Sequence, residues 1–360
     1  MSNAFRDLLR KVGSGAHTSK DLTRAEAAAA TQMMLTQEAT PAQIGAFMIA
    51  HRIKRPTGEE LAGMLDAYDT LGPKLSPIAA AYLPVVLGTP YDGRSRTAPV
   101  TPLVALILAA AGCPVVLHGG RRMPTKEGLP LVEIWQQLGV DWTRLSLEQV
   151  QQVFSQTLLG FVYLPTHFPL AEAMVTYREQ LGKRPPFATV ELFWCPYQGD
   201  ALVVSGFVHP PTEEMARVAA ELRGTQQFMT VKGLEGSCDL PRDRTCIIGV
   251  HRPDTDPPFN RLLIHPRDYG LAAPEVPLNS EVQLMEDMQA VLQGIPHPLM
   301  ESTILSGGFY LWQSGVCPNM DSGLAQAKEL LMGGGAAQKL AALRQAVMAA
   351  GSLRFAESSS

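Results

Sequence analysis

The chain has 360 residues, of which 46% are hydrophobic and 18% charged, and its formal net charge at pH 7 is −4. A chain of this length suits two domains better than one and can bury a large core. Its slightly acidic balance excludes a global positive field, so nucleic-acid binding would need a local patch of cations.

The N-terminal stretch MSNAFRDLLRKVGSG lacks the apolar segment of a signal peptide. The longest apolar run, residues 104–116, is broken by Gly112 and Pro114 and is too short to span a bilayer. The 5 cysteines form no CxxC pair, which suits a reducing compartment and argues against a zinc site or a disulfide frame. We therefore expect a soluble, cytoplasmic protein with no membrane partner.

The first 75 or so residues show only helical patterns. A threonine stands three residues before Glu or Gln, as a capping box requires, at Thr23/Glu26, Thr40/Gln43 and Thr57/Glu60. Ala, Leu and Met recur at helical spacing between these caps. The pattern predicts a small domain of about four helices over residues 1–75, and we expect helices around 168–185 to pack back onto it.

After residue 80, short β-branched runs alternate with amphipathic stretches. The predicted strands are 84–87, 114–117, 160–164, 202–208, 227–231, 245–250 and 262–265. The predicted helices are 103–111, 131–138, 147–155, 170–181, 211–222, 281–292, 324–331 and 337–349. This alternation is typical of a mainly parallel sheet covered by helices, so we predict an α/β domain over residues 80–352 and a frayed tail at 353–360.

Two neighbouring predicted strands end in loops that combine glycines with cations. The first loop contains Gly88, Thr89 and Asp92, followed by Arg94 and Arg96. The second strand ends in His118, Gly119, Arg121 and Arg122. Strand ends of this kind are where α/β sheets bind phosphates, so these loops predict an anion site. Alternatively, the arginines are ordinary solvated loop charges.

Five segments, which begin at Glu38, Gly88, Leu117, His167 and Leu305, follow one another in a collinear order. Together they resemble anthranilate phosphoribosyltransferase and its relatives in glycosyltransferase family 3. EATPAQIGAFMIAHRIK is close to that family's helical opening, and Gly88–Asp92 stands where the family has GTGGD. LHGGR at 117–121 stands where the family has KHGNR, HFPLAEAMVTYREQLGKR resembles a fourth segment, and LSGGFYLWQSG resembles a fifth. The resemblance covers nearly the whole chain. It implies a small helical domain hinged to a larger α/β domain, in a homodimer formed through the helical domain.

The resemblance also implies a reaction. The family transfers a phosphoribosyl group from phosphoribosyl pyrophosphate to an aromatic amine in tryptophan biosynthesis, with Mg²⁺ on the pyrophosphate. The positions carried over as phosphate or phosphoribosyl ligands are Gly88, Thr89, Asp92, Thr101, His118, Gly119, Arg121, Thr125 and Lys126, with Arg94 and Arg96 as added cations. A buried core role is the alternative for His118.

This chain departs from the family at several of these places. Pro90 and Tyr91 replace two glycines of the first loop, and Leu117 replaces the lysine of the second. Proline lacks an amide to donate, and a tyrosine side chain hinders close approach of the backbone to phosphate. The arginines of the two loops are possible compensation, because guanidinium groups bind phosphate bidentately.

The metal and acceptor positions are the last ones implied. The family's Asp-Glu metal pair aligns with Cys238 and Asp239, and Glu235 lies nearby; since Mg²⁺ prefers oxygen ligands, we expect a weakened site. Both acids are alternatively ordinary loop charges. Arg178, flanked by Tyr177 and His167, matches the arginine that faces the anthranilate carboxylate, or is alternatively a charge on a helix surface.

Three functions follow from these observations. The first is an anthranilate phosphoribosyltransferase-like transferase whose activity on anthranilate is weak or lost. The second is a non-catalytic paralogue that binds nucleic acid or another phosphorylated ligand through a local Arg/Lys patch, as suggested by a divergent branch of the family that shares the altered loop and the stretch at 233–236. The third is a nucleoside phosphorylase-like enzyme, which ranks last because nothing in the chain is typical of nucleobase recognition.

Overall fold

The computed structural model describes residues 3–15 and 17–357. Its first part consists of four helices, α1 (Asn3–Val12), α2 (Arg24–Leu35), α3 (Pro41–Lys54) and α4 (Gly58–Leu71). The three predicted capping boxes are confirmed, at the starts of α2, α3 and α4. Each box satisfies amides that have no partner inside the helix, which fixes where these helices begin.

Seven strands form one sheet in the order β3-β2-β1-β4-β5-β6-β7. Their bounds are β1 (Val85–Gly88), β2 (Val115–Gly119), β3 (Leu159–Tyr163), β4 (Leu202–Gly206), β5 (Gln227–Val231), β6 (Cys246–His251) and β7 (Phe259–Ile264). The first five in spatial order are parallel, and β6 and β7 are antiparallel. The predicted fold class, a helical part plus an α/β part with a mainly parallel sheet, is confirmed.

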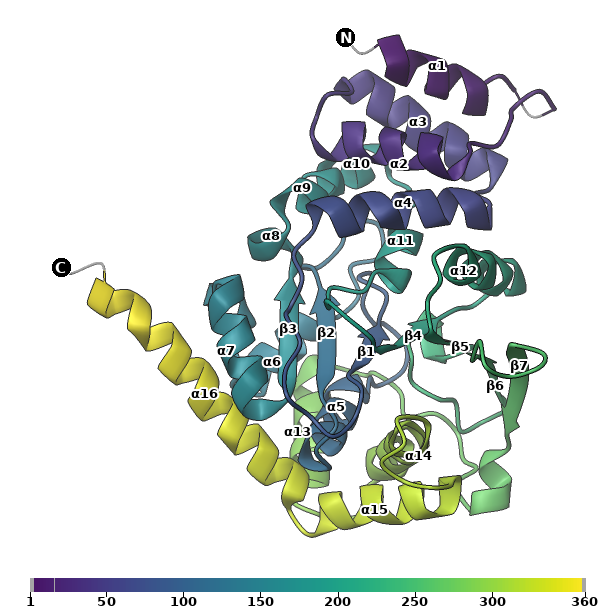
Figure 1. Ribbon diagram of the computed structural model, residues 1–360. Coiled ribbons are helices and arrows are strands. Elements are labelled where there is room, and N and C mark those ends of the chain that lie inside the picture. The colour runs from purple at the N-terminus through teal and green to yellow at the C-terminus, as the bar shows by residue number, and fades with distance from the viewer. Residues whose placement is uncertain (1–2, 16, 358–360) are drawn as a thin grey trace.

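Helices cover the sheet and connect its strands (Figure 1). Those of the first half are α5 (Thr101–Ala110), α6 (Leu131–Gln137), α7 (Leu147–Thr157), α8 (Leu164–His167), α9 (Pro169–Glu172), α10 (Met174–Leu181) and α11 (Phe187–Phe193). Those of the second half are α12 (Pro210–Leu222), α13 (Glu281–Leu292), α14 (Pro298–Gln313), α15 (Met320–Met332) and α16 (Gly335–Glu357). Three short 3-10 turns are η1 (Trp142–Arg144), η2 (Leu234–Gly236) and η3 (Pro266–Tyr269).

The N-terminal helices lie beyond the carboxyl ends of the parallel strands and are joined there by later segments (Figure 1). Helix α10 contacts α3, and both α11 and α12 contact α4. The boundaries proposed for the two domains stay a prediction. Helix α16 continues through Glu357, into the stretch predicted as a frayed tail, and residues 358–360 of that stretch lie outside the described residues.

Helix α14 is the main element that the sequence pattern did not predict. It carries Gly307 and Gly308 at its centre, residues that weaken an isolated helix. A Cβ at Gly308 would lie 2.7 Å from the Leu324 backbone in α15, and one at Gly323 would lie 2.2 Å from the Gly308 carbonyl oxygen. The glycines therefore allow α14 and α15 to approach closely, and tertiary packing outweighs the poor local propensity.

Candidate functional site

A cleft of about 370 Å³ opens at the carboxyl ends of β1, β4 and β5, beneath the N-terminal helices. Pro90 and Arg96 from the loop after β1, Lys126 from the loop after β2, and Glu235 from the turn after β5 all line it. The helical part contributes Arg52, at the end of α3. The carboxyl edge of a parallel sheet is where ligands bind in α/β proteins.

Cations outnumber carboxylates in the described lining of this cleft. Arg52, Arg96, Lys126 and Arg184 face a single acid, Glu235. Burial and the nearby Arg184 charge lower the pKa of Lys126, the charge of Glu235 opposes that change, and the charge of Arg96 adds to it. A bound anion would relieve this mutual repulsion, so the cleft is electrostatically suited to phosphate or carboxylate groups.

Arg94 does not face this cleft. Its side chain is 5% exposed and reaches across to the turn after β5, where Nη1 lies 2.6 Å from Oδ2 of Asp239 and 2.8 Å from Oγ of Ser237. Nε lies 3.3 Å from Oε1 of Glu235. One guanidinium thus joins both acids that were predicted as metal ligands.

Asp239 is further engaged at the start of α5. Its Oδ1 accepts a 2.8 Å hydrogen bond from Oγ1 of Thr101, and its Oδ2 accepts one of 3.1 Å from the Val100 amide. The carboxylate therefore caps the positive end of α5 in place of an N-cap side chain, since none is present at Val100. Thr101, predicted to contact phosphate, is buried in this interaction.

Glu235 holds the loop after β1 through its backbone. The amides of Ser95, Arg96 and Thr97 donate to its carboxylate at 3.2, 3.1 and 2.9 Å. Burial alone would raise the pKa of Glu235, but the Thr97 amide, the Arg94 charge and the other donors outweigh it and lower the pKa to about 2. Glu235 is therefore ionised at neutral pH and clamps this loop.

These contacts oppose the binding of a metal ion by Glu235 and Asp239. A fixed positive charge lies 2.6 Å from an Asp239 oxygen, where it would repel a divalent cation and already occupies the oxygen that the cation would need. Among residues 3–15 and 17–357, no group of three or more His, Cys, Asp or Glu side chains is arranged to hold a metal ion. In this arrangement the two carboxylates do not fit Mg²⁺.

Asp92 forms a second buried ion-pair cluster. Its carboxylate is 2% exposed and pairs with Arg178, and its Oδ2 lies 2.6 Å from Nε of Arg184. Arg178 is also 2% exposed, and its Nε donates to the Pro124 carbonyl at 3.0 Å. The predicted acceptor arginine is thus enclosed with Asp92, and Arg184 is the member that reaches the cleft.

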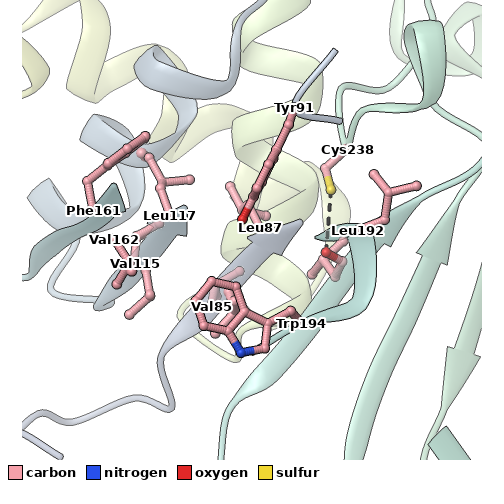
Figure 2. Close-up of a cluster of buried hydrophobic side chains, with 14 of the residues drawn as sticks. Val85, Leu87, Tyr91, Val115, Leu117, Phe161, Val162, Leu192, Trp194 and Cys238 are labelled. Carbon is pink, nitrogen blue, oxygen red and sulfur yellow. Dashed lines mark hydrogen bonds between the residues drawn. The ribbon is translucent and has the colours of Figure 1, made fainter. Parts of the chain in front are cut away.

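His118 lies in the core with no exposed surface. Its Nδ1 is hydrogen-bonded to the Tyr91 hydroxyl at 2.6 Å, and its ring contacts Trp194 edge-on. Burial lowers the pKa of His118 to about 3, so the ring is neutral at physiological pH. Tyr91, at the position of a family glycine, is buried among apolar side chains at the end of β1, close to Leu87 (Figure 2).

The other replaced positions are also apolar and buried. Leu117 lies within β2, and Cys238 directs its Sγ toward the Gly88 carbonyl at 3.1 Å and the Val204 carbonyl at 3.5 Å. Gly88 and Thr89 are buried beneath the cleft, and a Cβ at Gly88 would lie 2.1 Å from the Leu192 carbonyl oxygen. Gly88 therefore serves close packing of α11 on the end of β1.

The remaining predicted residues point elsewhere. Arg121 pairs with Glu172 at 2.5 Å, and Arg122 pairs with Glu133 and with Glu281. Gly119 is buried in β2, and Thr125 is exposed with a φ of 83°. The hydroxyl of Tyr177 donates to Gln37 at 2.9 Å, and His167 bonds the Tyr163 amide and the Leu145 carbonyl, both at 2.9 Å. The predicted cations thus do not form one patch.

Sequence reasoning missed residues that complete the cleft. Arg52, Arg184 and His209 line it, from α3, the loop before α11 and the residue before α12. Glu191, on α11, is near Arg178 and Arg184; burial raises its pKa to about 7 while these charges lower it. Arg52 and Arg184 lie within two segments that resemble the family, but only the topology brings these segments to the same cleft.

Family models match both parts of the chain. The helical bundle domain of a glycosyl transferase family matches residues 6–72, and the α/β domain of that family matches residues 86–337. The chain belongs to this glycosyl transferase family. Within the described residues, the structure contains no helix with the length and apolar character of a membrane span.

Individual relatives and structures agree with this membership. The anthranilate phosphoribosyltransferase of Afipia carboxidovorans is 29% identical over 94% of this chain and 97% of its own length, and that of Polynucleobacter necessarius is 26% identical over 89% and 93%. The crystal structure of the Thermus thermophilus enzyme superposes with a TM-score of 0.78 at 20% identity, over 96% of this chain and 100% of that chain. The Saccharomyces cerevisiae enzyme in complex with PRPP and Mg gives 0.78 at 16%, over 96% and 98%. The chain is an anthranilate phosphoribosyltransferase-like protein.

Proposed function

We propose that this family member binds a phosphorylated sugar of the phosphoribosyl pyrophosphate class in the strand-end cleft. The observation that carries the proposal is the cleft lining, in which Arg52, Arg96, Lys126 and Arg184 face one carboxylate. Phosphoribosyl pyrophosphate is also the ligand named for the yeast relative. Of the predicted phosphate-binding residues, Lys126, implied by the resemblance, and Arg96, an added cation, are the ones we assign to direct contact with phosphate.

The associated reaction is transfer of the phosphoribosyl group to an aromatic amine, with weak or lost activity on anthranilate. Tyr91, Leu117 and Cys238 put apolar groups where relatives bind pyrophosphate and metal, and Arg178 is paired with Asp92 instead of being free for an acceptor carboxylate. Each lost polar contact of this kind typically removes a few kcal/mol of transition-state stabilisation, and about 1.4 kcal/mol is a tenfold change in rate. We expect any divalent metal site to be weak, because the Arg94 guanidinium already pairs with Glu235 and Asp239.

The names of the relatives imply a role connected with tryptophan biosynthesis. We also propose a homodimer formed through the helical part and a cytoplasmic location. Nucleic acid is the less favoured ligand, because the net charge is −4 and both Arg121 and Arg122 are engaged in ion pairs.

Calorimetric titration with phosphoribosyl pyrophosphate tests the proposal. We expect saturable binding that Lys126→Ala weakens about tenfold, the effect of losing one charge-assisted contact. Arg267→Ala removes a cation that is 77% exposed and absent from the cleft lining, so it should leave binding unchanged. Equal affinity of wild type and Lys126→Ala would reject this cleft as the site.

Two further measurements separate the alternatives. Anthranilate fluorescence should show little or no consumption in the presence of Mg²⁺ and phosphoribosyl pyrophosphate, and robust turnover would reject the loss of activity. Titration with single-stranded DNA at two salt concentrations should show weak binding. Tight, strongly salt-dependent DNA binding without sugar-phosphate binding would instead support the nucleic-acid paralogue.

A further inference from the structure

Arg94 links two loops that meet at the edge of the cleft. It comes from the loop between β1 and α5, and its partners Glu235 and Asp239 come from the turn after β5. The side chains of Arg94, Glu235 and Asp239 are 5%, 7% and 3% exposed. An arginine buried this deeply serves its partners rather than solvent or a diffusing ligand.

The guanidinium has the geometry to replace a shared cation. Its planar fork presents Nη1 to Asp239 and Nε to Glu235, so one rigid group holds both carboxylates at a fixed separation. Glu235 also accepts bonds from the backbone amides of Ser95, Arg96 and Thr97, and Asp239 accepts one from Val100. Arg94 balances one of the two negative charges, and these amides stabilise the other together with Arg96, whose Nε lies 3.6 Å from Oε2 of Glu235, so no added ion is needed.

We propose that the Arg94 guanidinium is the built-in cation of this site, taking the place of a divalent metal between Glu235 and Asp239. Ligand binding in the cleft is then independent of divalent metal. The statement about the carboxylates concerns the protein alone, whereas the statement about ligand binding rests on the proposed function.

A consequence for ligand recognition follows from the burial of Arg94. Because its charge is consumed by two acids, it offers nothing to a phosphate in the cleft. The exposed cations Arg96 and Lys126, with Arg184, must meet ligand charge directly, where a metal-dependent relative would use a metal bridge. Direct contacts of this kind favour compact phosphorylated ligands that do not carry their own metal, and they make affinity sensitive to salt.

Manganese binding to the protein alone tests the first statement without any ligand. Electron paramagnetic resonance should show no stoichiometric Mn²⁺ site on the wild-type protein at micromolar concentrations. Arg94→Ala should create one site per chain, and adding Asp239→Asn to that variant should remove it. A wild-type site that Asp239→Asn abolishes, or a folded Arg94→Ala variant that gains no site, would overturn the proposal.

Loss of Arg94 leaves two acids facing each other, so Arg94→Ala is checked for folding by circular dichroism before the metal titration. Where it does not fold, Arg94→Lys is the replacement test, because lysine keeps one charge but cannot bridge two carboxylates as a fork. We expect Arg94→Lys to bind Mn²⁺ more tightly than the wild type, and an unchanged Mn²⁺ titration would overturn the proposal.

The second statement is tested with ribose 5-phosphate, which chelates magnesium weakly. Its affinity for the wild type should agree within about twofold between EDTA and millimolar Mg²⁺, and a rise of tenfold or more with Mg²⁺ would overturn metal independence. Absence of sugar-phosphate binding under both conditions would reject the proposed function. The Mn²⁺ titration would then still decide the role of Arg94, so the two failures are distinguishable.

Discussion

The Tyr91 hydroxyl and Nδ1 of His118 lie 2.6 Å apart in a pocket with no exposed surface at the histidine. Both residues lie at positions that the family resemblance connects with phosphate binding. Tyr91 replaces a glycine of the first loop, and His118 is the histidine kept in the second. Their pairing fills the space at the end of β1, where Tyr91 is 3% exposed and His118 has no exposed surface. Burial lowers the pKa of His118 and makes the residue a source of pH-dependent stability.

We predict that His118→Leu flattens the acid side of the stability profile. The pKa of His118 is lowered from 6.5 to about 3 by burial, so below pH 6.5 the unfolded chain binds a proton that the folded chain does not. Wild-type stability should therefore fall as pH drops from 6.5 toward 3, by roughly 2 kcal/mol at pH 5 from this residue, at about 1.4 kcal/mol per pKa unit.

Urea unfolding at pH 7.5 and pH 5 measures this effect. The loss assigned to His118 should be missing in His118→Leu, whatever the variant's absolute stability. His17→Asn, at an exposed histidine, controls for removal of an imidazole elsewhere. Parallel pH profiles for wild type and His118→Leu would contradict the assignment.

The two arginines at Asp92 should separate into a structural and a binding role. Arg178→Gln removes a partner that is 2% exposed and leaves a buried carboxylate, which typically costs about 3–5 kcal/mol. Arg184 is 42% exposed and lines the cleft, so Arg184→Gln should mainly weaken phosphoribosyl pyrophosphate binding, by about tenfold. Urea unfolding and calorimetric titration of both variants provide the comparison. An Arg178→Gln variant as stable as the wild type would refute the structural role.

Glu235 should control the order of the loop after β1. In Glu235→Gln, one fewer charge holds the amides of Ser95, Arg96 and Thr97, so their hydrogen exchange should be about tenfold faster or more. Because the pKa of Glu235 is lowered from 4.5 to about 2, its contribution is present above pH 4.5 and is lost as pH falls toward 2. Its size is at most about 3.5 kcal/mol, at about 1.4 kcal/mol per pKa unit.

Exchange measured by mass spectrometry on the peptide containing residues 94–97 checks this prediction. Glu214→Gln is the matched control, since Glu214 is exposed on α12 and pairs with Arg217, three residues along the helix. Unchanged exchange in Glu235→Gln would show that the clamp does not order this loop.

Much of the fold could be predicted from local signals. Capping boxes located α2, α3 and α4, and β-branched runs located all seven strands, because these patterns reflect short-range chemistry. The functional site was harder to predict from the sequence. Whether Arg94 faces a ligand or Asp239 depends on a contact across 145 residues of sequence, which no local pattern reveals. The same holds for Arg52 and Arg184, which only the tertiary fold brings to one cleft.

The close approach of α14 and α15 yields the last prediction, that Gly308→Ala destabilises the protein. The added Cβ would lie 2.7 Å from the Leu324 Cα, a backbone atom that cannot rotate away, and such overpacking typically costs about 1–3 kcal/mol. Gly45→Ala in α3 is the matched control, because the nearest atom to its added Cβ is 3.9 Å away and alanine favours the helix by roughly 1 kcal/mol. Urea unfolding should therefore move the two variants in opposite directions from the wild type. Equal or greater stability of Gly308→Ala would mean that helix propensity, not the α14–α15 contact, governs this position.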